Sequence, residues 1–298
     1  MDATELAGLL DSWRLALAAE RKAAATIATY TQSVKHYLAW CGRSDPLDRQ
    51  TLQQYVVGTI EGGAEPATAR TRQQAIRRYT AWLADPDVAE IPADPFVGVK
   101  PPKLDTKVVQ SLTADDLRVL IKACAGKQMW DRRDEAIIRL FAETGMRASE
   151  MVNLNTYDID LGNGRVLIQR GKGGRGRLVG FSAVTAAAID RYLRVRRRHR
   201  HAQDGALWLT RTSREPRLSY HGMRFALQNR AEAAGVVGFH IHKLRHTFAS
   251  RWLSAGGSEG GLMAAAGWRS RAMVDRYTRA TAGERAMQEA RALGLGDL

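Results

Sequence analysis

Apolar side chains recur every three to four residues through the first 84 positions, which is the spacing of one face of an α-helix. Four helices are predicted, over residues 5–20, 26–41, 48–60 and 66–83. Gly62-Gly63 ends the third, and Pro66 suits the first turn of the fourth because its missing N–H is not needed there. With no strand pattern among them, these helices predict a small helical bundle.

Prolines at positions 86, 92, 95, 101 and 102 interrupt regular patterning in the next stretch of the chain. We predict an interdomain linker there. It divides the chain into a helical domain of residues 1–86, a linker of residues 87–112 and a second domain of residues 113–298. Thr113 followed by Asp116 restarts a helix with a near capping box.

The pattern of the second domain is mixed. Residues 157–161, 165–170 and 177–181 are separated by glycine-rich turns, and the last two segments alternate, which predicts a three-stranded antiparallel sheet. Helices are predicted around this sheet, over residues 114–125, 131–144, 183–201, 219–234 and 242–255. The predicted fold class is therefore mainly α with a small antiparallel β-sheet.

Charge also differs between the two parts. Residues 1–100 carry 11 basic and 12 acidic side chains, whereas residues 101–298 carry 34 and 19, so the net charge of +14 belongs to the second part. This surplus favours a nucleic-acid partner, although a basic soluble protein could also carry it. Two widely spaced cysteines, no long apolar run and no signal-like N-terminus predict a cytoplasmic protein without a membrane span, a disulfide framework or a Cys-based zinc site.

Two segments place arginine where it can bind a phosphate. In residues 143–151, Arg147 lies at a helix break three residues before Glu150; taken alone, a surface ion pair explains this segment better. In residues 240–253, His242 and Arg245 share a helix face. Zinc binding by the two histidines of H-K-L-R-H is disfavoured because no third ligand is near in sequence.

Two further segments carry a lysine and a tyrosine. Lys172 stands in the glycine-rich turn of residues 170–179, which lacks the spacing of a nucleotide-binding P-loop and joins two strands, so a plain basic hairpin tip is the alternative. Tyr277 lies between two arginines, nine residues after Trp268. By itself it would be a packing residue.

In chain order these segments give Arg, Lys, His-x-x-Arg, Trp and Tyr. The set resembles the tyrosine recombinase (phage integrase) family, whose motifs run T-G-x-R-x-x-E, a hairpin G-K-G-x-K-x-R, H-x-L-R-H, G-H/W and a tyrosine nine residues later. The resemblance covers both predicted domains. Two positions depart from the common pattern: Trp268 stands where most members have His, and Arg175 replaces the second lysine of the hairpin.

The resemblance implies a strand-exchange enzyme whose two domains form a C-shaped DNA clamp and whose Tyr277 forms a 3′-phosphotyrosyl bond without a metal ion or cofactor. The implied catalytic residues are Arg147, Lys172, His242, Arg245, Trp268 and Tyr277, supported by Glu150 and His246. Basic residues expected to contact DNA are Arg70, Arg72, Arg77, Lys100, Lys103, Arg175 and Lys243.

The expected partner is double-stranded DNA with a specific recombination site, bound by a homotetramer, with accessory DNA-bending or directionality factors as further candidates. A mobile-element integrase, such as that of a phage, is the first expectation. A Xer-like resolvase of chromosome or plasmid dimers is second, because of Trp268. A type IB topoisomerase, which uses the same chemistry without a second DNA, and a catalytically inert DNA-binding derivative are the remaining alternatives.

Overall fold

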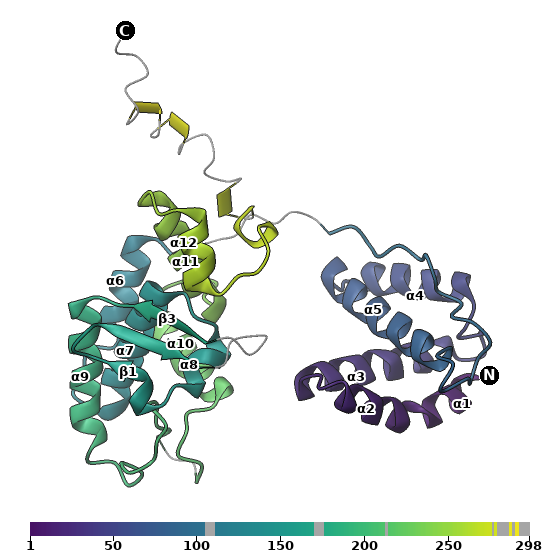
Figure 1. The fold of residues 1–298 in the computed structure, drawn as a ribbon, viewed down its shortest axis with the longest axis horizontal. Coiled ribbons are helices and arrows are strands. Elements are labelled where there is room, and N and C mark those ends of the chain that lie inside the picture. Colours follow the sequence, from purple (N-terminus) through teal and green to yellow (C-terminus); the bar gives the residue numbers. More distant parts are fainter. Residues whose placement is uncertain are drawn as a thin grey trace. The chain divides into compact units, whose positions relative to one another are not determined.

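A computed structural model of the chain describes residues 1–104, 111–169, 176–211, 214–275, 277–278, 286–287 and 290–291. The chain divides into two compact units, Met1–Lys107 and Val108–Leu298 (Figure 1). The described part of the first unit is helical, and that of the second combines helices with a small sheet.

The first unit contains α1 (Ala3–Gly8), α2 (Leu10–Ala19), α3 (Ala24–Cys41), α4 (Arg49–Glu61) and α5 (Pro66–Leu83). The last of these has the bounds that the sequence predicts. The first predicted helix is instead two, because Leu9 ends α1 and also caps the start of α2. Large aromatic side chains fill the centre of the unit, and Trp13 packs on Tyr79 with 4.9 Å between their ring centroids.

The segment after α5, predicted as a linker, contributes to the core of this unit. Phe96 is fully buried and Ile91 nearly so, within the same apolar cluster as the helices. Arg49 of α4 holds the segment by donating to the carbonyl oxygens of Pro95 and Val97, at 2.7 and 2.9 Å. The prolines thus exclude helix here, but buried side chains still order the segment.

The second unit begins with three helices, α6 (Ala114–Lys122), α7 (Met129–Thr144) and α8 (Ala148–Asn153). A single turn, η1 (Thr156–Asp158), leads into the strands β1 (Ile159–Asp160), β2 (Arg165–Ile168) and β3 (Arg177–Gly180). Helices α9 (Ala183–Arg196), α10 (Tyr220–Ala233), α11 (Ile241–Ser254) and α12 (Glu259–Ala266) follow.

The sheet is antiparallel with the order β1-β2-β3. Val166 pairs with Val179 on the buried face, and Leu167 pairs with Leu178 on the exposed face, as the alternation of side chains along a strand requires. The predicted fold class, mainly α with a small antiparallel sheet, is confirmed.

Helix α7 runs through the middle of the second unit and packs against both α9 and α11 (Figure 1). Its C-terminal residues are fixed by Glu143, whose carboxylate accepts from Ser182 and Thr185 at the start of α9. This end of α7 leads directly into the residues of the candidate site. Among the described residues, no helix combines the length and apolar character that crossing a membrane requires.

Candidate active site

The break between α7 and α8 positions the first arginine. Gly145 ends α7 in the left-handed conformation, with φ of +54°, and Arg147 caps the start of α8. The Arg147 main-chain N–H donates to Glu150 Oε2 at 2.7 Å, and its Nη1 donates to Glu150 Oε1 at 2.8 Å. The Arg–Glu spacing seen in the sequence is therefore a capping arrangement that aims the arginine side chain.

Glu150 is a buried carboxylate shared by two arginines. Besides Arg147, Arg177 of β3 donates to it through Nη1 and Nη2, at 2.9 and 2.7 Å. Burial alone would raise the pKa of Glu150, but the hydrogen bonds from Arg177 and from the Arg147 main chain outweigh it and hold the pKa below its ordinary value. Glu150 is therefore ionised at neutral pH.

Arg245 of α11 lies beside this pair. Its Nη1 donates to the Gly145 carbonyl oxygen, and its Nη2 donates to the Ala266 carbonyl oxygen at 2.8 Å. Burial, together with the nearby charge of Arg147, lowers the pKa of Arg245 to about 10, so the guanidinium remains charged at neutral pH. Arg147 and Arg245 thus bring two positive charges close together, which favours an anion at this place.

The carboxyl end of α12 is where these arginines meet. Three successive carbonyl oxygens there each accept from an arginine of a different element: Ala265 from Arg177, Ala266 from Arg245, and Gly267 from Arg147, at 2.8 Å in each case. Helix C-termini carry partial negative charge, which guanidinium groups stabilise. Elements α11, α12 and β3 lie next to one another in Figure 1.

Arg177 is the site residue that the sequence interpretation missed. It occupies the final arginine of the hairpin motif G-K-G-x-K-x-R, so the signal was present, but strand alternation gave no reason to expect its side chain at the site. The structure assigns it the salt bridge to Glu150 and the contact to Ala265.

Trp268 and Tyr277 stack at the edge of the arginine cluster. Their ring centroids are 5.3 Å apart at an interplanar angle of 16°, and the Arg245 guanidinium lies 5.3 Å from the Trp268 ring. Trp268 Nε1 is buried and has no hydrogen-bond partner among the described residues. A buried N–H without an acceptor is costly, and a phosphate oxygen would satisfy it.

The Tyr277 hydroxyl shares a hydrogen bond with His246 Nδ1 of α11. Tyr277 itself is buried, in a cluster with Trp268, Phe248 and Val274. His246, expected only to support the site, is thus the histidine that contacts the phenol. His242 lies one turn earlier on α11 and is exposed.

Three further expected residues need separate comment. Lys172 and Arg175 lie outside the described residues. Lys243 is only 9% exposed on α11, which fits a packing residue better than the DNA contact expected of it. The sequence could not separate these cases, because a lysine on the first turn of a helix is buried or exposed according to tertiary packing.

The basic residues of the first unit lie on and after α5. Arg70, Lys100 and Lys103 are exposed, Arg72 and Arg77 half-buried. Arg72 is one of the residues lining a cavity of about 750 Å³ between α3 and α5, together with Gln32, Ser33 and His36.

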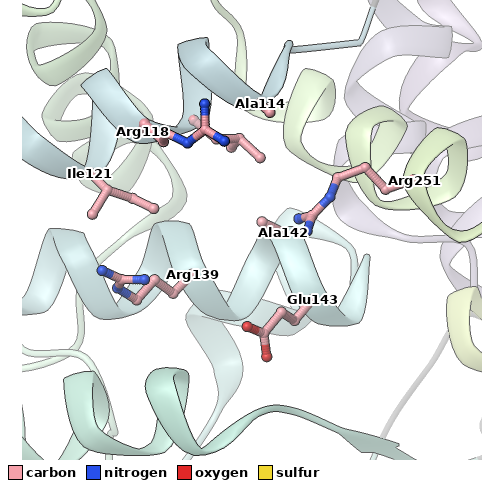
Figure 2. Close-up of a pocket in the computed structure, with 8 residues that line it drawn as sticks. Ala114, Arg118, Ile121, Arg139, Ala142, Glu143 and Arg251 are labelled. Carbon is pink, nitrogen blue, oxygen red and sulfur yellow. The ribbon is translucent and has the colours of Figure 1, made fainter. Parts of the chain in front are cut away.

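The candidate site is separate from a cavity in the second unit. That cavity, of about 250 Å³, lies between α6, α7 and α11, where Arg118, Arg139, Glu143 and Arg251 surround it (Figure 2). Of the expected catalytic residues that the structure describes, none lines it. Within the described ranges no group of three or more histidine, cysteine or acidic side chains is arranged to hold a metal ion.

Residues 110–284 match the model of the phage integrase family. The chain belongs to this family, the tyrosine recombinases, and is a DNA strand-exchange enzyme. Among curated relatives, tyrosine recombinase XerD of Mycobacterium tuberculosis (strain ATCC 25618 / H37Rv) is 32% identical over 276 residues, covering 85% of this chain and 86% of that protein. Tyrosine recombinase XerC of Pseudomonas fluorescens is 28% identical over 259 residues, covering 83% and 82%.

Solved structures of recombinases share the fold of this chain. A XerH site-specific recombinase bound to a palindromic difH substrate matches with a TM-score of 0.70 at 18% identity, over 91% of this chain and 80% of that chain. A lambda integrase tetramer bound to a Holliday junction matches with a TM-score of 0.66 at 18% identity, over 88% and 77%. The family membership favours a recombinase over the topoisomerase alternative.

Proposed function

We propose that this recombinase cleaves and rejoins duplex DNA through a 3′-phosphotyrosyl bond at Tyr277. The convergence of Arg147, Arg245, Trp268 and Tyr277 around the end of α12 carries the proposal. A phosphodiester placed there would meet two guanidinium forks, the unpartnered indole N–H and the phenol. No metal ion or cofactor is needed, because the arginines supply the positive charge.

Arg147 and Arg245 act as the phosphate clamp. Each guanidinium has five N–H donors, so it can bind a nonbridging oxygen as well as the α12 carbonyl that holds it. The charge on these oxygens increases as the pentacoordinate transition state forms. Donors already fixed in place stabilise that charge without reorganising during the reaction.

Tyr277 is the nucleophile. Its oxygen forms a bond to phosphorus while the bond to the 5′ oxygen breaks, and the departing oxygen takes a proton from Lys172. The phenol proton passes to His246, its hydrogen-bond partner, and His242 donates to the scissile phosphate from the same helix face. The reverse attack by a 5′ hydroxyl from a partner duplex restores the phosphodiester and exchanges the strands.

The helical unit serves as a core-binding domain, with Arg70, Arg72 and Arg77 on α5 and Lys100 and Lys103 after it as DNA contacts. Arg175 adds a contact at the hairpin. Both units contact duplex DNA, and four protomers assemble on two synapsed sites, with accessory factors setting direction. The lambda integrase tetramer on a Holliday junction, a structure of related fold, supports this assembly.

The biological reaction is integration of a mobile element, supported by Trp268 in place of the usual histidine. Resolution of chromosome or plasmid dimers is the second candidate, because the curated relatives cited above carry Xer names. Sequencing the DNA that is covalently attached to the protein in cells separates the two. Element ends joined to a chromosomal target indicate integration, and a single chromosomal or plasmid dimer-resolution site indicates resolution.

The nucleophile is tested with Tyr277→Phe on a nicked suicide substrate that carries this sequenced site. Covalent protein–DNA adducts should disappear, since phenylalanine has no oxygen to attack phosphorus, while DNA affinity stays close to that of the wild type. Thr278→Val, one residue on, is the control and should still form adducts. Adducts that persist in the phenylalanine variant would contradict the assignment of Tyr277 as the nucleophile.

A further inference from the structure

We infer that Arg177 is a positioning residue of the cleavage reaction, which acts through Glu150 to aim Arg147 at the scissile phosphate. This inference rests on the proposed function, because it takes Arg147 as a phosphate ligand. The hydrogen bonds of Arg177 go to Glu150 and to the Ala265 carbonyl oxygen, so its role is to hold other groups of the site.

All three nitrogens of the Arg177 guanidinium make a hydrogen bond. Nε donates to the Ala265 carbonyl oxygen at 2.8 Å, while Nη1 and Nη2 bind both oxygens of Glu150 at 2.9 and 2.7 Å. Its side chain is only 13% exposed. A bidentate pair fixes the carboxylate in orientation as well as in place, which a lysine cannot do.

Of the three side chains, Glu150 is the most buried and Arg147 the most exposed. Arg147 is 28% exposed, Glu150 3% and Arg177 13%. The carboxylate therefore lies beneath Arg147, with Arg177 holding its other side. Without Arg177, the buried Glu150 would retain a single cationic partner, and Arg147 would be drawn toward it and away from the phosphate.

Arg177 also connects two parts of the proposed chemistry. It is the first residue of β3, five positions after Lys172, and it contacts the end of α12 just before Trp268. Its guanidinium lies so close to Gly267 that a Cβ there would come within 2.9 Å of Nη1. The strand that follows the general acid is thus tied to the turn that precedes Trp268 and Tyr277.

The test compares suicide substrates with a phosphate or a methylphosphonate at the scissile position. A methylphosphonate has a methyl group in place of one charged nonbridging oxygen. Its cleavage rate should therefore depend less on the exact position of the Arg147 guanidinium. Arg177→Ala should slow adduct formation on the phosphate by about 10²-fold, the effect expected of a small displacement of a catalytic group. On the methylphosphonate, Arg177→Ala should slow adduct formation only about threefold or less. The difference between the two substrates measures how much transition-state stabilisation depends on Arg177.

Controls separate positioning from folding. Arg177→Lys keeps the charge but not the bidentate geometry, and should lose nearly as much as Arg177→Ala. Arg165→Ala removes an exposed arginine of β2 that pairs with Asp160, and should match the wild type on both substrates. If the alanine variant does not fold, the lysine variant alone gives the same comparison, and DNA affinity and thermal unfolding establish its integrity.

The outcomes are distinct. Equal losses on the two substrates would show a merely structural role and overturn the inference, as would no loss at all. If the wild type forms Tyr277-dependent adducts and Arg177 variants behave like it, only this inference fails. If the wild type forms none on its true site, the proposed function fails and the inference with it. Glu150→Gln combined with Arg177→Ala should add little to either single change, because both act on the same arginine.

Discussion

Glu150 shows how single side chains are coupled at this site. It was expected from the motif only as support for the active-site architecture, yet it accepts four hydrogen bonds from Arg147 and Arg177 while being nearly inaccessible to solvent. The sequence alone was enough to name five of the candidate-site residues, because each stands at a position of the family motifs. They are Arg147, Glu150, Arg245, Trp268 and Tyr277.

Contacts between motif residues could not be predicted from spacing. His246, rather than His242, meets the Tyr277 hydroxyl, and Arg177 reaches Glu150 across 27 positions of sequence. Such pairs depend on how β3, α8 and α11 pack, and one sequence carries no record of that packing. The same reason explains why Lys243, expected on a surface, is buried.

A pH dependence of stability follows from Glu150. Its pKa is lower in the folded protein than in the unfolded chain, so its ionised form contributes stability that is present above about pH 4.5 and lost as pH falls through the folded pKa. Glu150→Gln should lower the free energy of unfolding by about 3 kcal/mol at neutral pH, because two partly buried guanidinium groups lose their buried counter-charge. The deficit should narrow as the solution is acidified.

Urea unfolding of both proteins at neutral and acidic pH measures this difference. Asp115→Asn, which breaks an exposed pair with Arg118 in the same unit, should show a small deficit that varies little with pH. A Glu150→Gln deficit that stays constant down to acidic pH would contradict the ionised, paired state of this carboxylate.

At the scale of elements, the spacing of apolar residues predicted where helices occur better than it predicted the residues at which they end. The bounds of α5 match because Pro66 fixes its start, whereas the helix expected over residues 183–201 ends at Arg196. Arg196 turns inward there and donates to carbonyl oxygens of the following loop, including those of Ala202, Asp204 and Ala206. In the sequence, such an arginine cannot be distinguished from an exposed arginine within a helix, so the end of α9 could not be predicted.

The break between α7 and α8 gives an element-scale prediction. A Cβ on Gly145 would lie 2.1 Å from Cδ1 of Phe248, and its φ of +54° already disfavours other residues. Gly145→Ala should therefore combine about 1–2 kcal/mol of backbone strain with about 1–3 kcal/mol of overpacking. It should also slow adduct formation, because the Gly145 carbonyl holds Arg245.

Gly235→Ala is the matched control for this change. Gly235 has a φ of +71° but nothing within 4 Å of its would-be Cβ, so that variant should lose only the strain contribution and keep its cleavage rate. Thermal unfolding and adduct formation measure both effects. Equal stability losses for the two variants would mean that close packing on Phe248 does not require a glycine between α7 and α8.

At the scale of the whole molecule, net charge is distributed unevenly along the chain. The helical part, residues 1–100, is nearly neutral, and the remainder carries the surplus of basic residues. Apolar periodicity and the prolines after it predict a helical domain of residues 1–86, and Ile91 and Phe96, from the following segment without helical periodicity, also pack into the core of the first unit. The proposed DNA contacts of the first unit therefore depend on local groups such as Arg70 rather than on overall charge.

The salt dependence of DNA binding tests this arrangement in the intact protein. Each arginine that neutralises a phosphate releases counterions, so removing one contact should reduce the slope of log affinity against log salt by about 0.9 on duplex DNA. Arg70→Ala should show this reduction on a random-sequence duplex, since phosphate contacts do not depend on sequence. Arg14→Ala, which removes a basic residue of the same unit that pairs with Asp11, should leave the slope unchanged. An unchanged slope for Arg70→Ala would remove Arg70 from the DNA surface. A reduced slope would mean that a nearly neutral unit binds the duplex through local arginines, while the second unit supplies most of the electrostatic attraction.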